Sequence, residues 1–191
     1  MKPRRQLVAL IAFALLAGRT FAFLPPAKPP LPNLDARNQQ AIEESTLSAD
    51  RSAALSGLRL LVPNVKVDFE PVTRAPKQIS SLDGFLTGPA GLGRGVSAAA
   101  LTAIPADDPH RIAKAFLREH SGLFGYGAEA LDESQARVNR EFTTQHNGMT
   151  TVVWEQSVDG VPVFEALLIA HTTRQGELVS IGSQFVVNPR L

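Results

Sequence analysis

Four histidines come closest to a metal-binding or acid–base set in this sequence, but their spacing does not assemble one. His110 and His120 lie on one predicted helix, about 15 Å apart at about 1.5 Å of rise per residue. Zinc ligands, in contrast, lie about 2 Å from their metal. Glu119-His120 lacks the second histidine of an H-E-x-x-H site. His146 falls in a predicted turn and His171 near the end of a predicted strand, so we expect no metal site.

Motifs for nucleophilic catalysis and for phosphate binding are missing as well. Ser183, in Ile-Gly-Ser-Gln-Phe, lacks the second glycine of G-x-S-x-G and follows a predicted strand. The carboxylate pairs at 43–44 and 107–108 are adjacent in sequence, which is typical of helix caps and solvated charge. The glycine-rich stretch 88–95 does not match the spacing of a phosphate-binding loop. We therefore expect no catalytic residue and no cofactor, and predict that this chain is not itself an enzyme.

Composition narrows the possible partners and compartments. The chain has 191 residues, of which 44% are hydrophobic, which is enough for one domain with a core. A formal net charge of +1 gives no reason to expect nucleic acid as a partner. There is no cysteine, so disulfides and thiolate chemistry are excluded.

The N-terminus has the pattern of a bacterial secretory signal peptide. Lys2, Arg4 and Arg5 precede the apolar run 7–17, and Ala22 ends a small-x-small cleavage site. The run is shorter than the roughly 20 residues that span a bilayer, although a retained anchor stays the alternative. We predict a signal peptide at 1–22, a secreted, periplasmic or extracellular location, and no membrane attachment after cleavage. Residues 23–56 read as a linker, first rich in proline and then polar.

The remaining chain, 57–191, predicts one α+β domain with a single main helix on a curved antiparallel sheet. Residues 57–87 alternate like a β-hairpin, and 88–106 read as a loop. Residues 107–121 predict the helix, with Asp108 as its cap and Pro109 in the first turn. From 135 to 188 the pattern is a meander of about four strands separated by short turns.

The stretch 154–164 is the clearest part of that meander. Asp159-Gly160 between apolar runs predicts a two-residue type I′ turn, which would place Trp154 opposite Glu165 and Gln156 opposite Val163. Gln156 then shares the inward face with Trp154. Because unpaired burial of an amide costs about 1–3 kcal/mol, Gln156 should bond to a neighbouring loop backbone or contact a partner protein.

The segment resembles the fungalysin/thermolysin propeptide (FTP) domain, found in the N-terminal prodomain of secreted fungalysin-type zinc metallopeptidases. In that family an apolar-aromatic strand ends in glutamine before a turn into Gly-Val-Pro-Val-Phe/Tyr, and with the upstream hairpin and helix the resemblance covers roughly 57–188. The residues that carry the match, with a structural or partner-contact role, are Trp154, Gln156, Gly160, Val161, Pro162, Val163 and Phe164.

The resemblance implies a secreted propeptide that acts as an intramolecular chaperone and inhibitor. Its partner would be a zinc metallopeptidase catalytic domain, in cis or in trans, and the peptidase activity would lie in that domain. The sequence contains neither that domain nor the second prodomain half that usually follows. Three interpretations stay open: a fragment or truncated precursor, the N-terminal part of a metalloendopeptidase, and a stand-alone secreted protease-binding module.

Overall fold

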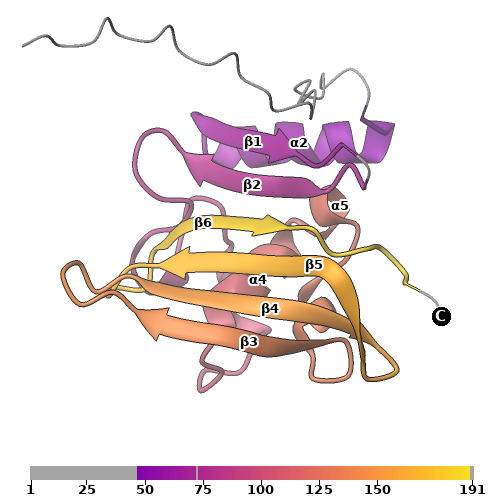
Figure 1. Cartoon of the computed structure of the whole chain (residues 1–191). Helices are drawn as coiled ribbons and strands as arrows, with labels where there is room; N and C mark the ends of the chain where they lie inside the picture. Colours follow the sequence, from indigo (N-terminus) through magenta and orange to yellow (C-terminus); the bar gives the residue numbers. More distant parts are fainter. Residues whose placement is uncertain (1–46, 72, 190–191) are drawn as a thin grey trace, which may run out of the picture. The chain divides into compact units, whose positions relative to one another are not determined.

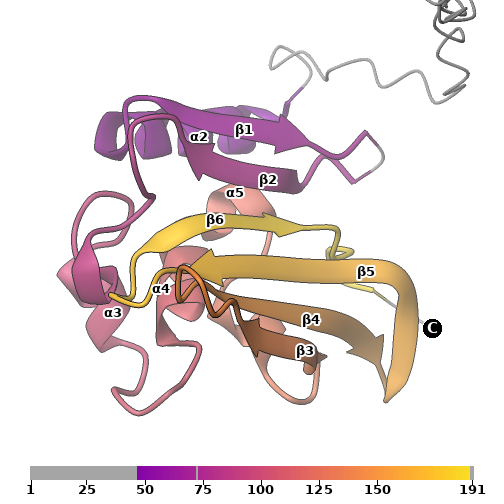
Figure 2. The ribbon, with the colours of Figure 1, turned by 60° about the vertical axis from the view of Figure 1, so that its left-hand side comes forward.

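The computed structural model describes residues 47–71 and 73–189, so the predicted signal peptide, with Ala22, and most of the predicted linker lie outside the described residues. The fold is α+β: one antiparallel sheet of six strands, with helices packed on one of its faces (Figures 1 and 2). The strands are β1 (Val65–Phe69), β2 (Pro76–Ser81), β3 (Ala136–Thr143), β4 (Thr150–Val158), β5 (Val161–Thr172) and β6 (Leu178–Ser183).

The helical segments are more numerous than the single main helix predicted from the sequence. They are α2 (Ala49–Leu61), α3 (Ala98–Thr102), α4 (Arg111–Glu119) and α5 (Ser121–Phe124), with short 3₁₀ turns η2 (Pro89–Gly91) and η3 (Ala128–Leu131). The expected boundary at 57 therefore falls inside α2, and the expected loop 88–106 contains α3. Ser48 caps α2 by accepting a hydrogen bond from the backbone N–H of Arg51.

The expected helix 107–121 is two helices that break at His120. Helix α4 begins at Arg111 with His110 at its N-cap position, so the predicted cap Asp108 and the following Pro109 both precede the helix. The Asp108 carboxylate accepts instead from the backbone N–H of His110 in the preceding turn. Helix α5 ends at Gly125, whose φ of +90° is the left-handed conformation that glycine adopts without strain. Ala113, Phe116 and Leu117 are buried in the core and form the apolar stripe of α4.

The strand order β1-β2-β6-β5-β4-β3 corrects the predicted four-strand meander with a separate hairpin. The hairpin β1–β2 joins the sheet because β2 pairs with β6, although that pairing covers only Ile79↔Ile181 and Ser80↔Ser180. Strand β6 thus lies between two strands far from each other in sequence. The core is a single cluster between the sheet and the helices, and its largest members are Trp154, Phe116, Phe124 and Phe185.

Candidate partner-binding surface

The β4–β5 hairpin places Trp154 in the core and leaves Phe164 in solvent. Strand alternation turns Val152, Trp154 and Gln156 toward the helices. The Trp154 side chain is 2% exposed, and the His110 ring lies edge-on against it with centroids 5.0 Å apart. Phe164, also a residue of the motif, is 88% exposed. One hairpin therefore contains one buried and one exposed aromatic residue.

The tip of this hairpin follows the predicted register, and its middle does not. Asp159 and Gly160 both have positive φ, as a type I′ turn requires, and the first pair is Val158↔Val161. After Ser157↔Pro162 the register shifts, so that Trp154 lies opposite Leu168 rather than Glu165. The extra residues form a wide bulge at 163–166 opposite Gln156.

The bulge explains the exposure of Phe164. Glu165 within it has φ +55°, a conformation uncommon for a residue with a side chain. This local reversal interrupts the in–out alternation, and regular burial resumes at Ala166 and Leu168. Phe164 is consequently directed away from the core, while Val161 and Pro162 are exposed and Val163 is half-buried.

Gln156 fills the space behind the bulge and holds the segment after β6. Its amide nitrogen donates to the backbone carbonyl of Val186 at 2.9 Å, and its amide oxygen accepts from the Val186 backbone N–H at 2.8 Å. The residue is buried, so these two bonds satisfy an amide that would otherwise cost stability. Phe185, next to Val186, is fully buried against Tyr126. The exit of the chain from β6 is thereby fixed beside the motif.

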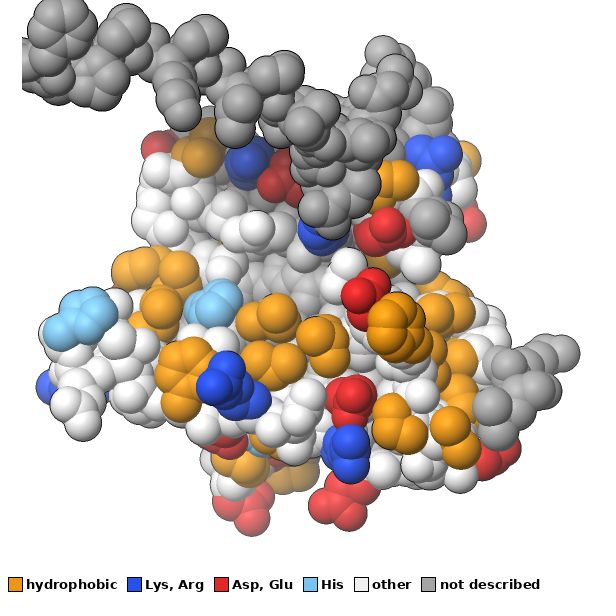
Figure 3. All heavy atoms as spheres, viewed as in Figure 1, with side chains coloured by type: hydrophobic (Ala, Val, Ile, Leu, Met, Phe, Trp, Pro, Cys, Tyr) orange, Lys and Arg blue, Asp and Glu red, His pale blue; other side chains and the backbone are white. Residues whose placement is uncertain are grey.

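Among the described residues, no helix packs on the second face of the sheet, which presents apolar side chains. The cross-strand partners Val153 and Ile169 point to this side, as do Leu167 and Phe142. We call Phe142, Val153, Leu167 and Ile169 the open face. All four are exposed or half-buried, and Figure 3 shows hydrophobic side chains gathered over β4 and β5. Exposed apolar side chains that gather on one face of a folded domain make that face a candidate interaction surface.

The sequence pattern missed the open face, although it contained a signal for it. Val152-Val153 and Leu167-Leu168-Ile169 place apolar residues at both parities of their strands. A strand with one solvated face alternates apolar and polar residues, whereas apolar residues at both parities indicate two covered faces. The helices cover one of these faces, and the other is available to a partner.

The histidines do not form a catalytic group. His110 packs on Trp154, His120 makes a 2.6 Å hydrogen bond through Nε2 to the carbonyl of Gly95, and Nδ1 of His171 lies 2.9 Å from Oγ1 of Thr151. His146 is exposed in the β3–β4 turn. Within the described residues, 47–71 and 73–189, no three His, Asp or Glu side chains cluster in a way that could hold a metal ion.

Burial makes the stability of the domain sensitive to acid. Burial lowers the pKa of His120, and it also lowers the pKa of the half-buried His171. The folded state therefore favours the neutral imidazole. The stability that each histidine contributes is complete above the unfolded-state pKa of about 6.5, and is lost as the pH falls through the folded-state value.

We expect the urea midpoint of the wild type to be lower at about pH 5.5 than at about pH 7.5. The substitution His120→Gln should make this decrease smaller. Glutamine keeps a donor for the Gly95 carbonyl but does not titrate. The quantity compared is the change in urea midpoint between these two pH values, measured for each protein. His146→Gln in the exposed turn is the control. If the urea midpoint decreases equally in His120→Gln and in this control, buried His120 is not the cause of the acid sensitivity.

The part of the chain from β3 to β6, which includes the bulge and Gln156, corresponds to one known sequence family. Residues 134–185 match the fungalysin/thermolysin propeptide motif. We refer to this matched segment as the FTP motif. A search of curated proteins and a search of solved structures find no match to the chain. The resemblance inferred from the residues is thus confirmed over β3 to β6, while α2 and the β1–β2 hairpin lie outside the matched range.

The FTP motif is known from one class of proteins. It is a non-catalytic motif of propeptides of fungalysin- and thermolysin-type peptidases, which are secreted and whose propeptides associate with the catalytic domain. Among the helices of the described part of the chain, none has the length and apolar character needed to cross a bilayer. All seven residues predicted from the motif belong to β4, β5 or their turn.

Proposed function

We propose that this chain is a secreted, non-catalytic prodomain that assists the folding of a zinc metallopeptidase catalytic domain and inhibits that domain until it is removed. The observation that carries the proposal is the apolar open face on the FTP motif. A sheet that buries one face against its own helices and leaves the other apolar has a surface suited to a folded partner. The partner would be bound in cis or in trans.

The direct experiment is a titration in trans. Residues 23–191 are added to a fungalysin-type catalytic domain, and peptidase activity is measured together with the yield of active enzyme after refolding. We expect inhibition that saturates with prodomain concentration and a higher refolding yield. Loss of both effects in a correctly folded prodomain would refute the proposal.

Phe164 is not one of the residues of the open face, but it is the most exposed aromatic residue of the FTP motif and has the largest expected contribution to binding. An exposed aromatic side chain that fills an apolar pocket of a partner typically accounts for 2 kcal/mol or more, which is roughly thirtyfold in affinity. We expect Phe164→Ala to raise the inhibition constant by about tenfold or more, with little change in the unfolding midpoint.

The matched control for Phe164 is Leu60. It is another large apolar side chain, 86% exposed, but it lies on α2, outside the FTP motif. Leu60→Ala should leave the inhibition constant within about twofold of the wild type. Equal effects of the two substitutions would indicate a nonspecific apolar contact instead of a defined surface.

A further inference from the structure

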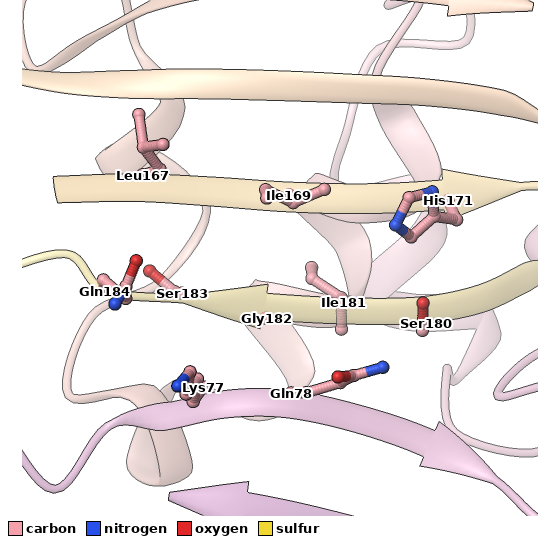
Figure 4. Close-up of a pocket in the computed structure, with 10 residues that line it drawn as sticks. All are labelled: Lys77, Gln78, Leu167, Ile169, His171, Ser180, Ile181, Gly182, Ser183 and Gln184. Atoms are coloured by element: carbon pink, nitrogen blue, oxygen red, sulfur yellow. The ribbon is translucent and has the colours of Figure 1, made fainter. Parts of the chain in front are cut away.

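A hollow of about 200 Å³ opens on the uncovered side of the sheet, where β2, β6 and β5 run side by side (Figure 4). It is smaller than the roughly 300–1,000 Å³ of sites that enclose drug-sized ligands, so it suits a single side chain. Its lining combines an apolar wall, Leu167 and Ile169, with polar side chains from three strands and the segment after β6. The polar ones are Lys77, Gln78, His171, Ser180, Ser183 and Gln184.

Gly182 shapes the floor of this hollow. It pairs with Ile169 of β5, and a Cβ at this position would collide with the backbone carbonyl oxygen of Lys77. The glycine thus lets the β2 backbone approach β6 closely. Since the two strands form only two cross-strand pairs, the side chains of Lys77 and Gln78 are left at the rim rather than in a continued ladder.

Several polar side chains of the hollow are available to a ligand, although Ser183 is buried and already bonded to Tyr126. Within the described part of the chain, the side chains of Lys77, Gln78 and Gln184 make no hydrogen bond or ion pair, and Lys77 and Gln78 are exposed. His171 uses Nδ1 for its contact with Thr151, which leaves Nε2 unused. Lysine and the two amides can all donate hydrogen bonds.

The charge in the lining of the hollow is positive. None of its lining residues is an aspartate or a glutamate, and Lys77 contributes a full positive charge. Outside the lining, the Glu155 carboxylate opposite Leu167 pairs with Arg137 at 2.6 Å. The Asp68 carboxylate opposite Gln78 lies 3.2 Å from Lys66. An ammonium group and several N–H donors beside an apolar wall complement a carboxylate carried on methylene groups, because charge-assisted hydrogen bonds are the stronger ones.

We propose that this hollow is a binding site for a carboxylate side chain, glutamate or aspartate, that projects from the surface of the peptidase domain. The proposal rests on the proposed prodomain function and adds the position and chemistry of one contact. The carboxylate meets Lys77 and the amides of Gln78 and Gln184, while its methylene groups lie on Leu167 and Ile169. The contact adds charge specificity to an otherwise apolar surface.

The first test replaces Lys77 by glutamate and measures the affinity of the full chain, purified after export, for the catalytic domain. A charge reversal opposite a carboxylate should weaken binding by about tenfold or more, and less at high salt. The control is Lys66→Glu, on neighbouring strand β1 and outside the hollow, where the lysine lies 3.2 Å from Asp68. A similar loss for both variants, or no loss for either, would overturn the proposal.

The second test does not depend on a peptidase. N-acetyl-glutamate is titrated into the full chain, with N-acetyl-glutamine as the neutral control, and the side-chain amide resonances of Gln78 and Gln184 are followed by NMR. We expect larger shifts with the acid, and their loss in Lys77→Glu. Equal shifts with both compounds would overturn the carboxylate site. If the acid shifts these resonances but the wild type fails to bind the catalytic domain, the prodomain function fails and the carboxylate site stands.

Discussion

Replacing Trp154 by alanine is expected to lower the free energy of unfolding by about 3–5 kcal/mol, the range for truncating a large buried aromatic side chain. The indole is 2% exposed and packs against His110 beneath the sheet. Its removal leaves a void between β4 and the start of α4 that the backbone cannot fill. Urea unfolding at neutral pH measures the loss.

The control for Trp154 comes from the same hairpin. Phe164→Ala removes an aromatic ring of comparable size from a side chain that is 88% exposed, so its effect on stability should stay within about 0.5 kcal/mol. The pair separates a core role from a surface role within one motif. Equal losses would mean that the bulge does not hold Phe164 in solvent.

Gln156→Leu is the second substitution with a large expected effect. Leucine keeps the volume but removes both bonds to Val186, so a backbone N–H and a carbonyl lose their partners. Val186 is 38% exposed, so water can partly reach the freed groups. The loss of two hydrogen bonds at about 0.5–1.5 kcal/mol each gives an expected loss of about 1–3 kcal/mol. Unfolding in urea gives the total, and amide hydrogen exchange at Val186 should become faster.

Gln184→Leu supplies the comparison for Gln156. Its side chain is half-buried and makes no hydrogen bond within the described residues, so the change should stay within about 0.5 kcal/mol. Protection of the Val186 amide should not change in this variant. Unchanged Val186 exchange in Gln156→Leu would contradict the role of the amide as a clamp on the exit segment.

Local signals in the sequence accounted for the centre of the fold. The alternation in 150–158, the Asp159-Gly160 turn and the stripe of α4 each depend on neighbours within a few residues. The β2–β6 pairing could not be read in this way. It joins Ile79 to Ile181 over only two pairs, so no periodicity in either segment specifies the other.

The candidate surface, too, could be predicted only in part from the sequence. Residues 154–164 could be located from the motif, but the exposure of Phe164 depends on the bulge. The bulge could not be predicted, because its residue with positive φ is Glu165 and not a glycine. The bond from Gln156 to Val186 joins residues far apart in sequence. Burial of Gln156 was predictable from strand alternation, whereas its partner became evident only from the three-dimensional arrangement.

The place of β6 between β2 and β5 has a consequence for the order in which this domain can be built during synthesis. Among the described strands, β6 is the last to leave the ribosome, yet it alone connects the β1–β2 hairpin to the β3–β5 meander. The two halves made earlier cannot join into one sheet before residue 183 has emerged. We therefore expect this domain to reach its native state only after nearly all of it has been synthesised.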